Sequence, residues 1–469
     1  MTTPSAQTDR FVHDRLPPRD QWPELRYDLP ELRIADQANL VERLLDGAAA
    51  RGWADRPLLR SPQITFTYAE TRERVDRIAN YLVHELKLEP GNRVLLRGGN
   101  SIGMALSWLA VVKAGLIAVA TMPLLRATEL SKVIDKAQPV AAICDARLLQ
   151  ELEQAQQAFP ALQHVLRFNS PDDPSDLGQL VAHQAATFTA CPTSADDIAL
   201  LAFTSGTTGA PKAVVHTHRD VLAACEAWPR HVLRPTSDDI VTGSPPLAFT
   251  FGLGGLLLFP MWAGASIYYP DANYNPETMV RQMREQGVTT CYTSPTFYRQ
   301  LAPHMKAIGV PSLRTCVSAG EALPDATRQL WKQATGIEML DGIGATEMFH
   351  IFISSAGADV RRGAVGKVVP GYHAKVVDEQ GAEVPRGTVG KLAVIGPTGC
   401  RYMDDERQRR YVPDGWNRPG DAFVQDEDDY FHYQARDDDM IITSGYNVGG
   451  PEVEDCLLTH PAVAECGVI

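Results

Sequence analysis

The sequence predicts an α/β protein built on a largely parallel sheet. Helix-like segments alternate with short apolar runs, a rhythm that is typical of βαβ units. One such run, residues 198–203, ends in a cluster of Gly, Ser and Thr, as a buried strand does when it enters a loop. From residue 365 onward, short β-like runs are separated by Gly, Pro and Asp, which predicts a small antiparallel barrel or sheet.

The elements before the loop follow in chain order. Apolar residues at helical spacing predict a helix over residues 39–52, and alternation predicts a strand over residues 64–68. Further strands are predicted at residues 93–96, 116–120 and 141–144. The most membrane-like run, residues 104–120, is interrupted by Lys113 and Gly115. We expect a buried helix that turns into a strand, because a membrane span needs about 20 consecutive apolar residues.

The second half of the chain continues the pattern. The polar residues 169–176 predict a loop or joint, and strands are predicted at residues 265–269, 289–292, 374–378 and 390–395. Pro451 followed by Glu452 and Glu454 predicts the start of a helix, since proline and acidic residues favour the first turn.

Bulk properties narrow the class of protein. At 469 residues the chain is too long for one simple core, so two or more domains are expected. The net charge of -13 argues against a nucleic-acid partner, whose binding surface would be basic. The 8 cysteines are scattered without paired spacing, and the N-terminus has no apolar signal core. We therefore expect a cytoplasmic protein with reduced thiols and no membrane partner.

The most informative segment is the string from Thr204 to Lys212. Its glycines let backbone N–H groups approach an anion, its hydroxyls add donors, and the lysine adds positive charge. It is not a Walker A loop, because the spacing differs and Ala213 follows the lysine. The alternative is a flexible polar loop, but the ordered string favours a phosphate site.

This string resembles the signature loop of the adenylate-forming superfamily, which includes acyl-CoA synthetases, luciferases and adenylation domains of peptide synthetases. Further segments resemble other motifs of that superfamily in the same order, namely residues 318–324, 341–347, 420–421 and 436–442, the last followed by 444–447 and 450–454. Residues 341–352 are most similar to the aromatic-acid branch with its benzoate–CoA and 2-aminobenzoate–CoA ligases. Residues 122–127 resemble the 2-aminobenzoate members.

The resemblance implies a domain organisation. Residues 1–435 would form a large N-terminal domain of two stacked α/β subdomains with a small β-barrel subdomain at about residues 365–435. Residues 436–469 would be the hinge, at Asp438, and the incomplete first part of a small α+β C-terminal domain. The loop of Ser444, Gly445 and Tyr446 would lie on the side of coenzyme A.

The resemblance also assigns an ATP site. The phosphates would be held by Thr204, Ser205, Gly206, Thr207, Thr208, Gly209 and Lys212, and the adenine side by Gly320, Glu321, Asp341, Gly342 and Ile343. The ribose would be held by Asp421 and Arg436, the α-phosphate by Thr346, and Mg²⁺ by Glu347, so that Lys212, Thr346 and Glu347 are the catalytic residues. Ile343 departs from the aromatic residue of many relatives. Ordinary surface, turn and ion-pair roles are the alternatives for Glu347, Asp421 and Arg436.

The acid pocket is expected beside the ATP site. The resemblance places Phe249 at a gate position and surrounds a flat ring with Thr250, Phe251, Ala319, Gly344 and His350. Apolar walls with few polar groups suit a small aromatic carboxylic acid. Core packing is the alternative for the aromatic residues, and a hydrogen-bonded structural role is the alternative for His350.

The resulting functional expectation is an ATP-dependent aromatic acid–CoA ligase, acting on 2-aminobenzoate or, second, benzoate, with ATP, Mg²⁺ and coenzyme A. A homodimer is possible. The alternatives are an aryl-acid adenylating enzyme that loads a carrier protein, and a nucleotide-binding protein without turnover. The superfamily's late catalytic lysine does not occur before Ile469, so we expect these 469 residues to adenylate slowly.

Overall fold

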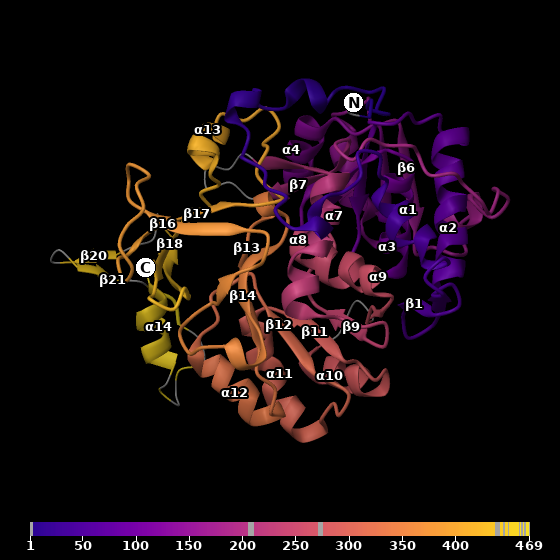
Figure 1. The fold of residues 1–469 in the computed structure, drawn as a ribbon. Coiled ribbons are helices and arrows are strands. Elements are labelled where there is room, and N and C mark those ends of the chain that lie inside the picture. Colours follow the sequence, from indigo (N-terminus) through magenta and orange to yellow (C-terminus); the bar gives the residue numbers. More distant parts are fainter. Residues whose placement is uncertain are drawn as a thin grey trace.

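A computed structural model describes residues 3–204, 211–270, 275–436, 441–443, 446–448, 450–458, 460, 463 and 466–468. Within these residues the chain forms four sheets of six, nine, four and two strands. Figure 1 shows the six-stranded sheet beside the nine-stranded one, with the four-stranded sheet at the edge of the molecule near the C-terminus. No helix in the described part of the chain has the length and apolar character of a membrane span.

The six-stranded sheet carries the predicted phosphate loop. Its order is β6-β5-β3-β4-β7-β8, and all pairs except β7–β8 are parallel. The strands are β3 (Arg93–Arg97), β4 (Ile117–Thr121), β5 (Ala141–Asp145), β6 (His164–Phe168), β7 (Ile198–Thr204) and β8 (Lys212–Thr217). The helices that accompany it are α1 (Leu40–Leu44), α2 (Tyr68–Asn80), α3 (Ile102–Lys113), α4 (Ala127–Ala137), α5 (Leu149–Gln156), α6 (Leu177–Leu180) and α7 (His218–Glu226).

The nine-stranded sheet is parallel in its centre and antiparallel at both edges. Its order is β15-β14-β13-β12-β11-β9-β10-β1-β2. The strands are β1 (Pro57–Arg60), β2 (Thr65–Thr67), β9 (Ile240–Gly243), β10 (Ser266–Tyr268), β11 (Thr290–Thr293), β12 (Thr315–Ser318), β13 (Leu340–Gly344), β14 (Ile351–Ser355) and β15 (Lys367–Val368). The helices along this part are α8 (Thr250–Leu253), α9 (Phe259–Ala263), α10 (Pro276–Glu285), α11 (Pro295–Ile308) and α12 (Asp325–Thr335).

The β-rich segment forms an antiparallel sheet in the order β16-β17-β18-β19. Its strands are β16 (His373–Val377), β17 (Gly390–Ile395), β18 (Asp421–Gln425) and β19 (Phe431–Arg436), with α13 (Gln408–Tyr411) between β17 and β18. The last described elements are β20 (Ile441–Thr443), β21 (Tyr446–Val448) and α14 (Gly450–Leu458). The domain boundary at residue 436 stays a prediction.

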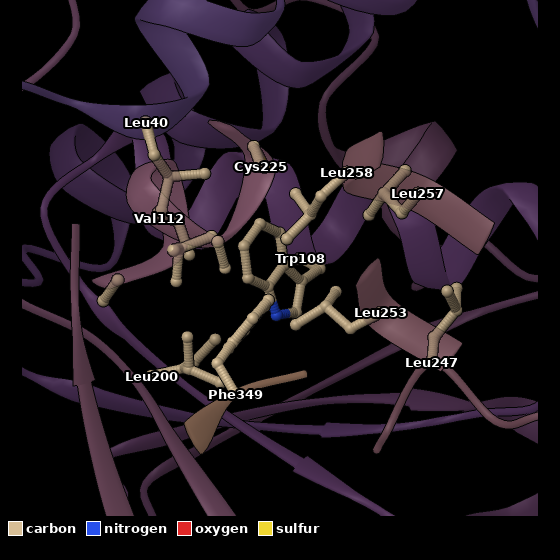
Figure 2. Close-up of a cluster of buried hydrophobic side chains, with 14 of the residues drawn as sticks. Leu40, Trp108, Val112, Leu200, Cys225, Leu247, Leu253, Leu257, Leu258 and Phe349 are labelled. Atoms are coloured by element: carbon tan, nitrogen blue, oxygen red, sulfur yellow. The ribbon is translucent and has the colours of Figure 1, made fainter. Parts of the chain in front are cut away.

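Buried helices fill the space between the two large sheets. Figure 2 shows Trp108 of α3 at the centre of a cluster to which Cys225 of α7, Leu253 of α8 and Leu200 of β7 contribute. Trp108 is only 1% exposed. Because α3 is buried almost all round, the apolar run from residue 104 is explained by this packing, and the prediction of a buried helix that turns into a strand is confirmed.

The sequence predicts the α/β class correctly but one helix too long. The helix expected over residues 39–52 ends at Leu44 and is followed by a separate 3-10 turn, Asp46–Ala48. The guanidinium of Arg51 donates to the carbonyls of Arg43 and Leu44, and thereby satisfies backbone acceptors at the helix end. This contact needs the chain to turn back, which helical spacing alone does not reveal.

Candidate active site

A cleft of about 540 Å³ lies between β13 of the nine-stranded sheet and β18 and β19 of the four-stranded sheet. It is lined by Gly320, Glu321, Ala322, Leu323, Asp325, Arg328, Asp341, Gly342, Ile343, Gly344, Gly363, Ala364, Val365, Asp421, Phe423, Tyr433, Gln434 and Arg436. Eight of these are site residues that the resemblance implied: Gly344 for the acid pocket, and seven for ATP, namely Gly320, Glu321, Asp341, Gly342, Ile343, Asp421 and Arg436. Residues separated by more than a hundred positions thus meet in one cleft.

Two charged residues stand at one wall of this cleft. Asp421 and Arg436 are register partners on β18 and β19, and Arg436 Nη1 lies 3.0 Å from Asp421 Oδ1. The Asp421 side chain is largely buried, whereas the Arg436 side chain is about half exposed. A carboxylate accepts and a guanidinium donates, so the pair offers both kinds of partner to a ligand with neighbouring hydroxyls.

Glycines shape the opposite wall. A Cβ at Gly344 would lie 2.6 Å from the backbone oxygen of His350, so only glycine permits this close approach of β13 and the chain that enters β14. Gly320 has φ of +93°, a left-handed conformation that ends β12 in a tight turn. Neither glycine places a side chain in the cleft, which both of them line.

Asp341 is a carboxyl group held at the cleft with little solvent around it. Its side chain is 12% exposed, and its Oδ2 lies 3.9 Å from Arg328 Nη2. Burial raises the pKa of Asp341 to about 7, although Arg328 and the Gly342 N–H act in the opposite direction. Arg328 was not predicted as a site residue, because it lies in α12 and only the fold brings it beside β13.

Two aromatic rings line the same cleft as Ile343, which stands where many relatives have an aromatic residue. Phe423 and Tyr433 line the cleft from β18 and β19, with ring centroids 5.5 Å apart. Ile343 lines the cleft from β13. The sequence reading missed both rings, since no local pattern distinguishes them from ordinary strand residues.

The base of the predicted phosphate loop is an antiparallel strand pair. Thr204, at the end of β7, is the register partner of Lys212, at the start of β8. The intervening Ser205, Gly206, Thr207, Thr208 and Gly209 lie outside the described residues. Among the residues described, the buried Thr204 Oγ1 has no hydrogen-bond partner, and an unpaired buried hydroxyl is costly unless a ligand satisfies it.

Lys212 lies next to Glu347, which belongs to the predicted motif at residues 341–347. Its Nζ lies 3.7 Å from Glu347 Oε1 and donates to the hydroxyl of Tyr402 at 3.2 Å. The Tyr402 hydroxyl in turn donates to Glu347 Oε1. Tyr402 was not predicted as a site residue. It lies 55 positions from Glu347, and no pattern in the sequence indicates that the two side chains meet.

Thr346 and Glu347 begin the short 3-10 helix Thr346–Met348 that follows β13. His216 of β8 donates from Nε2 to the carbonyl of Thr346 at 2.7 Å, which ties this helix to the six-stranded sheet. Burial lowers the pKa of His216, so the imidazole is neutral, and a carbonyl can only accept; these two facts assign the proton to Nε2. The structure therefore fixes Thr346 next to the base of the phosphate loop.

Two of the predicted acid-pocket residues, Phe251 and His350, belong to an aromatic cluster. His350 is 4% exposed, its ring centroid lies 5.6 Å from that of Phe251, and its Nε2 donates to the Phe251 carbonyl at 3.4 Å. Trp228 and Phe259 also pack on His350, at 5.3 and 4.5 Å. Burial lowers the pKa of His350 to about 3, so the ring is neutral at physiological pH.

One ring nitrogen of His350 makes no hydrogen bond to the described residues. Among the described residues, the buried Nδ1 has no hydrogen-bond partner, and the hydroxyl of the neighbouring Tyr292 also has none. In the neutral ring Nδ1 is an acceptor, because Nε2 carries the proton. An apolar cluster with a few unpaired polar atoms is typical of a pocket for a small, largely apolar ligand.

The remaining predicted site residues are placed as follows. Thr250 begins α8 and Ala319 follows β12, and both are buried. Phe249 precedes α8 and is 37% exposed, with no ring contact among the described residues. Tyr446 begins β21. Asp438, Ser444 and Gly445 lie outside the described residues.

The donor set fits Mg²⁺ but not an all-protein metal cage. Within the described ranges, no group of three or more His, Cys, Asp or Glu side chains is placed to hold a metal ion. Mg²⁺ is usually bound through one or two carboxylates together with substrate phosphates. Glu347, a largely buried carboxylate beside the base of the phosphate loop, meets this requirement.

Comparisons with known proteins place these features in one family. The model of the AMP-binding enzyme family matches residues 47–401. The chain is 32% identical to the benzoate–CoA ligase of Thauera aromatica, over 94% of this chain and 84% of that protein. It is 31% identical to the anthranilate–CoA ligase of Pseudomonas aeruginosa, over 81% of this chain and 74% of that protein.

A solved structure agrees with the sequence comparison. The crystal structure of the anthranilate CoA ligase AuaEII in complex with anthranoyl-AMP matches with a TM-score of 0.89 and 32% identity, and the match covers 94% of this chain and 86% of that one. Similarity at this level of identity and coverage, in both sequence and fold, indicates homology. The protein is a member of the AMP-binding enzyme family, with benzoate–CoA and anthranilate–CoA ligases among its homologues.

Proposed function

We propose that this protein is an AMP-forming aromatic acid–CoA ligase, with 2-aminobenzoate as its first candidate substrate and benzoate as its second. The carrying observation is the path of the chain from Ile343 to His350. Within eight positions it lines the cleft, contacts the base of the phosphate loop and enters the aromatic cluster. A nucleotide and a small aromatic acid held at these places would meet near Thr346.

The cleft would take the nucleoside of ATP. Asp421 and Arg436 would bind the two ribose hydroxyls, and the adenine would lie between Ile343 and the rings of Phe423 and Tyr433. Gly320, Glu321, Asp341 and Gly342 would line the base. Asp341 accepts through its carboxylate oxygens and would receive the exocyclic amine of adenine.

The phosphates would extend from the cleft towards Lys212. Residues 204–209 and Lys212 would bind the β- and γ-phosphates, and Thr346 would donate to the α-phosphate. Glu347 would hold Mg²⁺, which supplies charge neutralisation of the phosphate oxygens. Thr204 Oγ1, which has no hydrogen-bond partner among the described residues, and the ammonium of Lys212 support this placement.

The aromatic acid would lie against Phe251 and His350, with Phe249 as the gate and Thr250, Ala319 and Gly344 as further walls. The neutral His350 has one acceptor nitrogen without a partner among the described residues, which suits a hydrogen-bond donor such as a ring amino group. The similarity to the anthranilate–CoA ligase and to the AuaEII structure supports the same substrate class.

The proposed reaction requires two anions, the carboxylate of the acid and the α-phosphate of ATP, to be held side by side. A carboxylate oxygen of the acid attacks the α-phosphorus of ATP, the bond to pyrophosphate breaks, and the acyl-adenylate forms. The sulfur of coenzyme A then attacks the acyl carbon, AMP leaves, and the thiol proton passes to solvent. The residues of this chain contribute mainly donors and positive charge placed where negative charge accumulates. Asp438 is proposed as the hinge, and Ser444, Gly445 and Tyr446 as the loop beside coenzyme A.

The decisive test is calorimetric titration of the full chain, preloaded with a non-hydrolysable ATP analogue, with 2-aminobenzoate, benzoate and a medium-chain fatty acid. Tight binding of one aromatic acid alone supports the proposal and names the substrate. Preference for the fatty acid, or no binding of any of the three, contradicts the aromatic assignment.

A pyrophosphate-release assay separates the remaining alternatives. Turnover rejects a nucleotide-binding protein without activity, and release of free thioester with coenzyme A alone rejects carrier loading.

A further inference from the structure

Tyr402 comes from a short segment that extends the six-stranded sheet beyond β8. Val215 N donates to the Arg401 carbonyl at 2.8 Å, and Met403 N donates to the Ala213 carbonyl at 2.9 Å. Tyr402 lies opposite Val214 in this antiparallel pairing. Because opposed residues share a face of the sheet and Lys212 is two positions from Val214, Tyr402 and Lys212 lie on one face.

The ring of Tyr402 has little freedom to move. The residue is fully buried, its backbone N–H donates to Gln408 Oε1 at 2.8 Å, and its ring meets Tyr411 edge-on with centroids 5.6 Å apart. The preceding residue, Arg401, forms a buried ion pair with Asp220 of α7. These contacts therefore hold the Tyr402 ring, and with it the hydroxyl, in one position.

The hydroxyl joins the two charged groups of the phosphate site. It donates to Glu347 Oε1 and accepts from Lys212 Nζ at 3.2 Å, while the two charged atoms are themselves 3.7 Å apart. Both contacts to the carboxylate fall on Oε1, so within the described residues the second oxygen is the one available to a further ligand. A hydroxyl has one proton to donate, and here that proton is committed to Glu347.

We propose that Tyr402 is a positioning residue for the phosphate chemistry of this site, because its hydroxyl fixes the orientation of the Glu347 carboxylate and keeps Lys212 beside it. This inference rests on the proposed function, in which Glu347 holds Mg²⁺. Carboxylates that ligate metals are themselves held by hydrogen bonds, and loss of such a partner typically lowers metal affinity about 10- to 100-fold. Tyr402 acts through Glu347 and need not touch the nucleotide.

The test compares Tyr402→Phe with the unaltered chain in two calorimetric titrations, ATP alone and ATP with Mg²⁺. We expect the affinity for ATP alone to stay unchanged and the enhancement by Mg²⁺ to fall about tenfold. In a Glu347→Gln background, Tyr402→Phe should cause no further loss, since a residue that acts through Glu347 has nothing left to position. If turnover is measurable, kcat should fall while the KM for the aromatic acid is unchanged.

Tyr298→Phe is the matched control, because it also removes a buried hydroxyl: that of Tyr298 in α11, which donates to the Cys291 carbonyl of β11. It should lower thermal stability without changing the Mg²⁺ effect. If Tyr402→Phe does not fold, Tyr402→Met enters the same two titrations. An unchanged Mg²⁺ enhancement in the folded variant, or a loss that adds in full to that of Glu347→Gln, would overturn the proposal. Absence of pyrophosphate release by the unaltered chain would instead count against the proposed function.

Discussion

Asp421 and Arg436 face each other across β18 and β19 as register partners, and their side chains form an ion pair of 3.0 Å at the wall of the cleft. The pair links the first residue of β18 to the last residue of β19, 15 positions later in the chain. The antiparallel pairing of the two strands therefore builds the polar end of the cleft.

The first prediction concerns this pair. Asp421→Ala removes a buried acceptor and should raise the Kd for ATP about tenfold or more, since hydrogen bonds to charged groups contribute about 1.5–3 kcal/mol. Calorimetry with ATP measures the change, and titration with the aromatic acid is the control. The ribose assignment would be wrong if the variant bound ATP as the unaltered chain does.

The second prediction concerns Lys212. Lys212→Met keeps much of the side-chain length but removes the ammonium that lies beside Glu347. We expect kcat for pyrophosphate release to fall about 100-fold, because a lost charge at the reacting phosphates costs about 3 kcal/mol of transition-state stabilisation. Binding of the aromatic acid should not change. An undiminished kcat would place the phosphates elsewhere.

The third prediction is a pH dependence set by Asp341. Its pKa rises from 3.8 to about 7 on folding, so the folded chain binds the proton more tightly than the unfolded chain. The stability linked to this proton is present below pH 4 and is lost as the pH rises through 7. Asn does not titrate, so Asp341→Asn should gain stability relative to the unaltered chain between pH 4 and pH 7 and keep that gain above it.

Thermal unfolding at several pH values measures this difference. The expected gain is on the order of 1–4 kcal/mol, since each pKa unit corresponds to about 1.4 kcal/mol. A difference between the two chains that is flat from pH 4 to pH 8 would show that the Asp341 carboxyl does not titrate in this range.

The fourth prediction separates the acid pocket from the nucleotide site. A Cβ at Gly254 would lie 2.6 Å from His350 Cδ2 and 2.9 Å from the Phe259 ring. Gly254→Ala should therefore displace His350 and weaken binding of the aromatic acid about tenfold, with ATP affinity unchanged. Gly47→Ala is the control, because its Cβ would meet its neighbours at an ordinary 3.6 Å. Equal acid affinity in both variants would argue against a role for His350.

The fifth prediction concerns stability away from the site. Lys113 is 1% exposed, and its Nζ lies 2.7 Å from Asp46 Oδ1 and 2.5 Å from Asp76 Oδ1. Lys113→Ala leaves the buried Asp76 without its cation and should cost about 3–5 kcal/mol in the free energy of unfolding. Arg281→Ala, which breaks an exposed pair with Glu277, should cost less than about 0.5 kcal/mol. Denaturant unfolding of both variants measures the contrast.

The local features of this protein could be predicted from its sequence. The strand that leads into the predicted phosphate loop, β7, and the buried helix α3 follow from the spacing of apolar residues, whereas β8 after the loop was not predicted. Seven residues of the cleft were expected at the ATP site through the resemblance, because the motifs that carry it are short and contiguous.

The contacts between distant residues could not be predicted in this way. Tyr402 meets Glu347 and Lys212, Arg328 meets Asp341, and Trp228 packs on His350 only because the sheets pair in one order and register. The residues that flank a tyrosine, an arginine or a tryptophan in the sequence do not indicate which distant residue its side chain contacts. The sequence by itself determined which strands and loops form, through interactions between near neighbours in the chain. The tertiary structure decided which side chains complete the site, because burial and hydrogen bonding across sheets depend on the packing of the whole chain.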